Sequence, residues 1–229
     1  MTRAARAEGE PARAMIELFL EAYRLHLLRG LEGRLARSGY GLIAGVDEVG
    51  RGSLAGPVVA AAVIIGTRHL IPGVDDSKCL TPPERERAAA AIRATAVAAA
   101  VAAVPPDVID CVNILEASRQ AMCDALSRLR PAPDCAVVDA VRLSGFGFPC
   151  LPVIRGDCVS YAVACASILA KVERDRMMVE LDGQYPQYGF AAHKGYSVPE
   201  HLEALSAYGP CPVHRLTFRS VLPRTEVRC

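Results

Sequence analysis

The sequence predicts an α/β fold in which a mixed sheet is flanked by helices. Three short apolar runs lie close together at residues 42–46, 58–65 and 95–104, and two more follow at 135–139 and 151–154. Stretches with helical periodicity lie before, between and after these runs. Strands in close succession, followed by helices that alternate with further strands, are typical of a mixed sheet with helices on its faces.

The beginning of the chain has a pattern of its own. Apolar residues, most of them leucines, recur at helical spacing among charges over residues 14–37, which predicts one or two helices packed against the main domain. A Gly-Tyr-Gly triplet then ends this pattern. We therefore expect a helical extension at 1–39 with no role beyond packing, a single domain at 40–222 that includes a small helical C-terminal segment, and a tail at 223–229.

A helix and a third strand are predicted next. Pro82 and Pro83 open a charged, alanine-rich stretch that runs to about Thr95, and proline is well suited to the first turn of a helix. The alanines of residues 95–104 also permit a helix. The recurring valines and the stop at Pro105 favour a strand there.

Two longer helices and a short one complete the pattern. Residues 109–129 predict a single amphipathic helix that ends before Pro131. Residues 159–181 begin apolar and become charged from Lys171 onward, as a helix does when it leaves a core. A short helix is expected at 199–207, within a segment rich in tyrosine, glycine, proline and histidine.

Length and composition favour one soluble α/β domain. The 229 residues carry a net charge of +1, so a basic surface for a nucleic-acid partner must be local. No apolar stretch is long enough to cross a bilayer and no signal-peptide core is evident, so we expect a cytoplasmic protein without a membrane partner. The nine cysteines show no Cys-x-x-Cys spacing and are expected to be small buried thiols in a reducing compartment.

Acidic residues follow two of the buried runs. Asp47 and Glu48 are adjacent at the end of one run, Asp139 ends another, and Asp157 comes later, before the helix at 159–181. One such acid alone is usually a helix cap or a turn residue. Carboxylates repel one another and are costly to bury, so a convergence of all four would make sense around cations. Carboxylate oxygens are the hard ligands that Mg²⁺ and Mn²⁺ prefer.

A glycine turn stands directly behind the first two acids. Gly50-Arg51-Gly52 allows the backbone to come close to a sugar or a phosphate, because glycine has no Cβ. Most such triplets are only tight turns. The position of this one, next to Asp47 and Glu48, makes a substrate-binding role worth testing.

Other charged residues allow two interpretations. The only lysines of this arginine-rich chain are Lys78, Lys171 and Lys194. One interpretation is that each lysine places a compact ammonium where the planar guanidinium of arginine would not fit. The alternative is that their positions are due to chance. We interpret the turn residues Asp75, Asp76 and Asp107 as solvated loop or cap residues.

Several separated motifs occur in order along the chain over about residues 40–220. They are residues 45–57, Asp75-Asp76-Ser77-Lys78, Asn113-Ile114-Leu115, residues 166–172, Tyr188-Gly189-Phe190, His193-Lys194-Gly195-Tyr196, His201-Leu202 and residues 214–218. Together they resemble the motifs of the ribonuclease HII family, and their matching order makes the resemblance specific.

The resemblance implies a ribonuclease H-like fold and an endonuclease that hydrolyses the RNA strand of RNA·DNA hybrids. It also implies incision 5′ of ribonucleotides embedded in duplex DNA, which leaves a 5′-phosphate and a 3′-hydroxyl, by an enzyme that acts as a monomer. The family's catalytic acids, which hold two Mg²⁺ or Mn²⁺ ions, fall on Asp47, Glu48, Asp139 and Asp157. Asp47 would be the ligand shared by the two ions.

The resemblance also implies substrate-binding residues. The family's glycine turn falls on Gly50, Arg51 and Gly52, whose backbone would recognise a 2′-hydroxyl, a group that both donates and accepts a hydrogen bond. Tyr196 matches a tyrosine that would stack on a neighbouring sugar or base. Lys78 and Lys194 lie in matched motifs and are expected to contact the substrate. For Lys171, a role in tying helix to sheet is an equal alternative, and His193, His201 and His214 are expected to contact phosphate or to pack.

The chain departs from the family pattern at a few positions. Ala140 stands where the family usually has glycine, Cys79 replaces a usual lysine, and Cys158 and Cys165 take positions more often held by small residues. None of these changes removes an acid. Two alternatives stay open: another nuclease of the same superfamily that acts on DNA structures, and a protein that binds hybrids without cleaving them.

Overall fold

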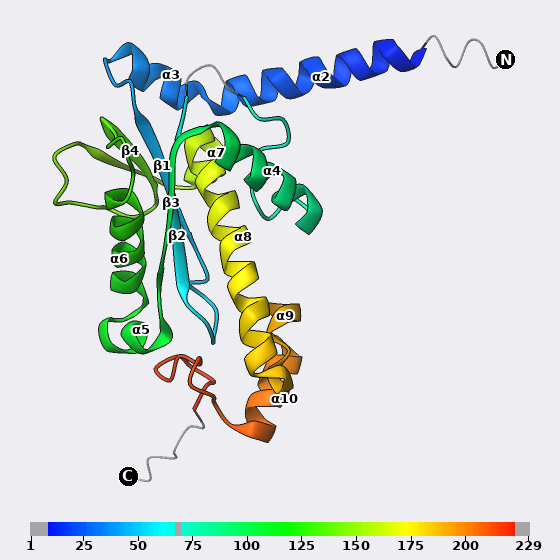
Figure 1. Ribbon diagram of the computed structural model, residues 1–229, viewed down its shortest axis with the longest axis vertical. Helices are drawn as coiled ribbons and strands as arrows, with labels where there is room; N and C mark the ends of the chain where they lie inside the picture. Colours follow the sequence, from blue (N-terminus) through cyan, green and yellow to red (C-terminus); the bar gives the residue numbers. More distant parts are fainter. Residues whose placement is uncertain (1–8, 67–69, 223–229) are drawn as a thin grey trace, which may run out of the picture.

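The structure contains the mixed sheet that the sequence predicts (Figure 1). The computed structural model describes residues 9–66 and 70–222. The five strands are β1 (Ile43–Val49), β2 (Val58–Ile65), β3 (Ala96–Val104), β4 (Cys135–Asp139) and β5 (Cys150–Val153). They lie in the order β3-β2-β1-β4-β5. The β1–β2 and β2–β3 pairs are antiparallel, whereas the β1–β4 and β4–β5 pairs are parallel.

Helices cover both faces of the sheet (Figure 1). They are α2 (Gly9–Leu28), α3 (Gly30–Arg37), α4 (Pro82–Thr95), α5 (Pro106–Val112), α6 (Ile114–Ser127), α7 (Gly156–Val159), α8 (Tyr161–Gln184), the 3₁₀ helix η1 (Pro186–Tyr188), α9 (Phe190–His193) and α10 (Pro199–Tyr208). The long helix α8 packs on one face and α6 on the other. At the far end of α8, α9 and α10 form the small C-terminal segment that the sequence predicts.

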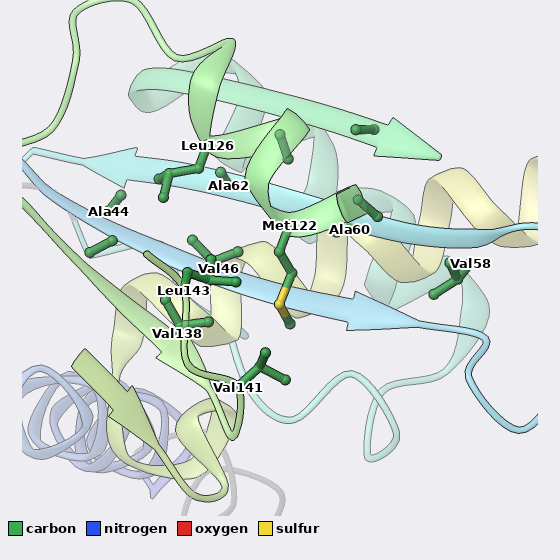
Figure 2. Close-up of a cluster of buried hydrophobic side chains, with 14 of the residues drawn as sticks. Ala44, Val46, Val58, Ala60, Ala62, Met122, Leu126, Val138, Val141 and Leu143 are labelled. Carbon is green, nitrogen blue, oxygen red and sulfur yellow. The ribbon is translucent and has the colours of Figure 1, made fainter. Parts of the chain in front are cut away.

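Strand β2 contributes to two hydrophobic cores at once, because successive side chains point to opposite faces of a sheet. Ala60 and Ala62 pack with Met122 of α6 in the core of Figure 2. Ala61 and Val63 pack in the core beneath α8. A strand that is buried on both faces reads as a continuous apolar run, which is how residues 58–65 appear in the sequence.

Helix α8 begins so close to β1 that no side chain fits at Gly45. A Cβ at this position would lie 2.0 Å from the backbone carbonyl carbon of Ala162. The first turn of α8 therefore packs directly on the strand that carries Asp47 and Glu48.

The single helix predicted at 109–129 was wrong, because the structure divides it into α5 and α6. Asn113 lies between them with a φ of 73°. Its side chain accepts hydrogen bonds from the backbone N–H groups of Leu115 and Glu116, at 2.9 and 3.2 Å, and so caps α6. A cap inside an amphipathic stretch leaves the hydrophobic periodicity almost unchanged, which is why the pattern alone did not reveal the break.

The helix predicted at 159–181 also differs from the structure. Val159 ends the short helix α7, Ser160 accepts a hydrogen bond from the backbone N–H of Val163 as the N-cap, and α8 starts at Tyr161. Asp157 therefore lies in α7, one turn before the long helix.

The N-terminal extension packs only in part as expected. Leu25 is buried, whereas Leu18 and Phe19 are 65% and 69% exposed on α2, which extends away from the sheet (Figure 1). The sequence pattern could not separate these faces, because apolar residues occur on every side of α2.

Helix α3 contributes a buried carboxylate to the start of α8. Glu32 Oε1 accepts hydrogen bonds from Ser160 Oγ at 2.6 Å and from the backbone N–H of Ala162 at 2.9 Å. A carboxylate at a helix N-terminus is favoured by both the N–H groups and the helix dipole. The extension thus stabilises α8 directly behind the turn that holds Asp157.

We expect Glu32→Ala to lower the free energy of unfolding by about 1–3 kcal/mol, because two buried donors lose their acceptor. Glu32→Gln keeps an acceptor oxygen in the same place and should lose less. Urea unfolding followed by circular dichroism measures both, with Glu17→Ala on exposed α2 as the control. Equal losses for the two Glu32 variants would show that charge, not hydrogen bonding, stabilises this helix start.

The thiols are less buried than the sequence suggested. Cys135, Cys165 and Cys211 are buried, but Cys79, Cys111 and Cys158 are exposed, and all cysteines in the described ranges are free. The predicted tail at 223–229 lies outside the described residues. Within 9–66 and 70–222, no helix combines the length and the apolar character needed to cross a membrane.

Candidate active site

Three carboxylates converge near the centre of the sheet. Asp47 and Glu48 lie within β1, which continues to Val49, and Asp139 is the last residue of β4. One carboxylate oxygen from each lies within 4.8 Å of the others. The parallel pairing of β1 and β4 aligns Val46 with Val138, so the next residue along each strand is an aspartate. The sheet register itself brings these acids together.

Burial raises the pKa of all three carboxyls. The pKa of Asp47 lies well above its usual range because the group is buried and because Glu48 and Asp139 add negative charge. Burial raises the pKa of Glu48 even though Arg51 Nη1 lies 3.2 Å from its Oε1. Burial also raises the pKa of Asp139, whose Oδ1 accepts a hydrogen bond of 2.6 Å from the backbone N–H of Gly156. Three such groups are costly to ionise together without a cation.

Glu48 shows that the site fits a hard metal ion. Its Oε2 is buried and has no hydrogen-bond partner in the structure. A buried carboxylate oxygen without a partner is normally avoided. Oxygen donors from three carboxylates match the preference of Mg²⁺ and Mn²⁺.

Asp157 lies beside this cluster in a second group of ligand atoms. Its carboxylate, an Asp76 carboxylate oxygen and the Cys158 thiol lie within 4.8 Å of one another. The two groups interact, since the charge of Asp157 contributes to the raised pKa of Asp139. Asp76, interpreted from the sequence as a solvated loop or cap residue, is therefore part of the site's surroundings. Its place in the motif with Lys78 was the available signal.

Lys78 Nζ lies between the acids of the second group, 3.5 Å from Asp157 Oδ2 and 3.8 Å from Asp76 Oδ1. Burial lowers the pKa of Lys78, but the charges of Asp76, Asp157 and Asp47 outweigh this effect and raise it overall. The side chain is 79% exposed, so the ammonium also faces solvent. It is placed to meet an anion that approaches the acids.

The turn after Asp139 places Ala140 in a backbone conformation that suits glycine. Ala140 has a φ of 50°, a backbone conformation that an L side chain disfavours. Its N–H donates to the carbonyl of Val153 at 2.9 Å, so the strained turn is fixed to β5.

We expect Ala140→Gly to raise the free energy of unfolding by about 0.5–1 kcal/mol, because glycine adopts this φ without strain. The same change at exposed Ala90, in the interior of α4, should lower it by about 1 kcal/mol, because glycine weakens a helix interior. Chemical denaturation of the two variants gives the opposite signs directly. A loss of stability at residue 140 would mean that the alanine methyl group makes packing contacts that outweigh the strain.

The glycine turn is fixed to the body of the protein by hydrogen bonds and steric contact. The carbonyl of Gly50 accepts from the backbone N–H of Ser53 at 3.4 Å, and the carbonyl of Arg51 accepts from Nη1 of Arg215 at 3.0 Å. A Cβ at Gly50, whose φ is 90°, would lie 2.1 Å from Arg174 Nε, whereas a Cβ at Gly52 would meet no atom within 4 Å. Gly50 therefore serves the fold, and Gly52 faces open space.

The other predicted substrate residues lie in the C-terminal segment. Tyr196 is half-buried, with the Arg174 guanidinium 5.5 Å from the centre of its ring. The Lys194 side chain contacts the carbonyl of Ala191 and lines a surface hollow together with Lys171, and none of the four predicted catalytic acids lines that hollow. The structure thus does not bring Lys194 Nζ to the carboxylate cluster.

The sequence left two roles open for the histidines, contact with phosphate or packing, and in the structure they pack. His201 and His214 are buried, with 3.0 Å between their Nε2 atoms. Burial lowers the pKa of His214 to about 4, so the ring is neutral at physiological pH. Lys171 Nζ pairs with Asp175 Oδ1 at 2.7 Å on the same helix.

A mixed sheet in this strand order, with clustered carboxylates on its central strand β1 and on the neighbouring β4, defines a nuclease of the ribonuclease H-like class. A sequence model of ribonuclease HII matches residues 44–221. The chain belongs to the ribonuclease HII family, whose members are hydrolytic endoribonucleases that act on RNA·DNA hybrids.

Individual relatives agree with this assignment. The ribonuclease HII of Ruminiclostridium cellulolyticum is 48% identical over 198 residues, which are 86% of this chain and 78% of that protein. The ribonuclease HII of Solibacter usitatus is 52% identical over 191 residues, 83% of each chain. The crystal structure of ribonuclease H2 from Pyrococcus horikoshii OT3 has a TM-score of 0.70 and 28% identity, covering 79% of this chain and 95% of that chain.

Proposed function

We propose that this enzyme hydrolyses the RNA strand of RNA·DNA hybrids and incises 5′ of single ribonucleotides embedded in duplex DNA. The products would carry a 5′-phosphate and a 3′-hydroxyl. The observation that carries this proposal is the convergence of Asp47, Glu48 and Asp139 within 4.8 Å, directly in front of the glycine turn. Asp157 on α7 completes the set of acids.

Two divalent cations, Mg²⁺ or Mn²⁺, are the proposed cofactors. Asp47, the most central acid, would be shared between them, with Glu48 and Asp139 on one side and Asp157 on the other. When bound, the ions supply activation of a water molecule and stabilisation of the departing 3′ oxygen. The partnerless Glu48 Oε2 and the raised pKa values of the three clustered acids support this, since nearby cations favour the ionised carboxylates.

The glycine turn is the proposed detector of the ribose. A Cβ at Gly52 would meet no atom within 4 Å, so the backbone of Gly52 is the part of the turn that a 2′-hydroxyl could approach most freely. The absence of a Cβ there lets the sugar approach the backbone. Tyr196 would stack on the neighbouring nucleotide, and Lys78 would meet a phosphate near Asp157.

An incision assay tests this proposal. The substrates are a 5′-labelled duplex with one ribonucleotide, an RNA·DNA hybrid, and an all-DNA duplex of the same sequence, each with Mg²⁺, Mn²⁺ or EDTA. We expect a cut 5′ of the ribonucleotide and cleavage of the hybrid in either metal, with no cleavage of DNA and none in EDTA.

Two other results would reject the proposal in distinct ways. Cleavage of branched or flapped all-DNA substrates without a ribonucleotide would identify a DNA-structure nuclease of the same superfamily. Tight binding of the hybrid without turnover in either metal would identify a protein that protects hybrids.

A further inference from the structure

Arg174 is a fully buried cationic side chain beneath the glycine turn. Its guanidinium donates hydrogen bonds to the carbonyls of Pro57 at 3.0 Å, Ala55 at 3.1 Å and Lys194 at 2.9 Å. All three acceptors are backbone carbonyls and not carboxylates. Burying a charge in this way is expensive, and burial lowers the pKa of the group. An arginine kept at such a cost is expected to have a role that a hydrophobic residue could not fill.

The three carbonyls belong to the two segments proposed to recognise the substrate. Ala55 and Pro57 follow the glycine turn in the loop at residues 50–57. Lys194 lies two residues before Tyr196, and the ring of Tyr196 stands 5.5 Å from the guanidinium carbon. The two segments are 137 residues apart if counted from Pro57 to Lys194. One backbone hydrogen bond joins them, from the N–H of Leu54 to the carbonyl of Gly195 at 2.8 Å, and the Arg174 side chain adds hydrogen bonds to both.

A second buried arginine fixes the same loop without joining the two segments. Arg215 donates from Nε and Nη2 to the carbonyl of Gly56 and from Nη1 to the carbonyl of Arg51. All of these hydrogen bonds go to the loop at 50–57, and the guanidinium also faces the Phe218 ring. Arg174 therefore differs from Arg215 in donating a hydrogen bond to the tyrosine segment as well.

We propose that Arg174 is a positioning residue that sets the glycine turn and Tyr196 at a fixed separation. A ribose at the turn and the adjacent nucleotide on the tyrosine ring would then be recognised together. The inference rests on the proposed function of these two segments. The planar fork of a guanidinium reaches three carbonyls in fixed directions, whereas the ammonium of lysine cannot reproduce that geometry.

The test compares Arg174→Lys with Arg176→Lys. Arg176 lies on the same helix and is exposed, and it pairs with Glu173 and Glu180. Affinity is measured by fluorescence anisotropy, with Ca²⁺ replacing Mg²⁺, for a duplex with one ribonucleotide and for an all-DNA duplex of the same sequence. We expect Arg174→Lys to reduce the preference for the ribonucleotide by about fivefold or more. Affinity for all-DNA duplex should stay within about twofold, as should both affinities of Arg176→Lys.

An unchanged preference in a folded Arg174→Lys protein, or an equal loss on both duplexes, would overturn the inference. If this variant does not fold, hydrogen exchange on the wild-type enzyme decides. Binding of the ribonucleotide duplex should then slow amide hydrogen exchange in residues 50–57 and in residues 194–196. Slower exchange in only one segment would contradict the proposal that the two recognise the substrate together. A wild-type enzyme without any ribonucleotide preference would instead reject the proposed function, and this inference with it.

Discussion

Asp47→Asn is expected to abolish incision and, at the same time, to stabilise the metal-free protein. The amide keeps the shape of the carboxylate and an acceptor oxygen for the backbone N–H of Glu48, which donates to Asp47 Oδ1 at 2.7 Å. It removes the charge that would hold the cations. We expect the rate to fall by at least about 10²–10³-fold, the loss typical when one preorganised electrostatic group is removed from an active site.

The gain in stability follows from the raised pKa of Asp47. The pKa of Asp47 is higher in the folded than in the unfolded protein. For such a carboxyl the free energy of unfolding is highest below the unfolded pKa, where the group is protonated in both states, and it falls as the pH rises towards the folded pKa. Asparagine does not titrate, so its advantage over aspartate should grow with pH. At pH 8 we expect the free energy of unfolding of Asp47→Asn to exceed that of the wild type by on the order of 1 kcal/mol or more, since one pKa unit corresponds to about 1.4 kcal/mol.

Single-turnover incision assays and thermal melts in EDTA measure both effects, with exposed Asp107→Asn as the matched control. Mn²⁺ should raise the melting temperatures of the wild type and of the control. It should raise the melting temperature of Asp47→Asn much less. Retained incision, or an unchanged response to Mn²⁺, would remove Asp47 from the metal site.

The two glycines of the turn should separate folding from substrate binding. Gly50→Ala places a methyl group against Arg174 at a φ of 90° and is expected to cost about 2–4 kcal/mol of unfolding free energy. Gly52→Ala meets no neighbouring atom and should change stability by no more than about 0.5 kcal/mol. Its methyl group would nevertheless stand where the ribose approaches, so KM for a ribonucleotide duplex should rise by about tenfold or more.

Urea unfolding and steady-state incision on the same preparations test this contrast, and each variant serves as the control for the other. A Gly52→Ala enzyme with normal KM would show that the ribose does not approach residue 52. Equal destabilisation by both changes would mean that the turn packs more tightly than the structure shows.

Most of the sheet could be predicted from the sequence because the central strands β1, β2 and β4 are largely buried. Residues 58–65 formed an apolar run with no alternation, as expected for a strand between two helical layers. The division at Asn113 could not be predicted in the same way, since one residue at positive φ does not disturb the hydrophobic pattern on either side. Hydrophobic periodicity indicates which face of a helix is buried, but it barely changes when a helix cap interrupts the stretch.

Asp47, Glu48 and Asp139 were found because they follow apolar runs in the sequence, although β1 continues past Glu48 to Val49. The parallel register of β1 and β4 is what brings Asp47 and Asp139 together. Their chemical roles, and those of the substrate residues, stay predictions. Asp76 was interpreted as a solvated loop or cap residue because its turn is flanked by proline and glycine, and only the fold brings it next to Asp157.

The residues that the sequence could not reveal are those that act through distant backbone. Arg174 lies in a charged stretch of α8, where arginines at 174 and 176 look alike, yet one is buried and the other is exposed. Glu32 resembles any surface glutamate of an amphipathic helix, and its partners, Ser160 and Ala162, are more than 120 positions away. Contacts of this kind leave no periodic trace.

The missing side chain at Gly45 has a consequence for how this active site tolerates change. The backbone of β1 contacts the first turn of α8 with no side chain between them, so the distance between the sheet and the helix is very short at this point. The acids of β1 belong to one layer, and Asp157 precedes the helix of the other. Any larger residue at position 45 would therefore push the strand and the helix apart, and would increase the separation between Asp157 and the acids of β1 without altering one of the acids.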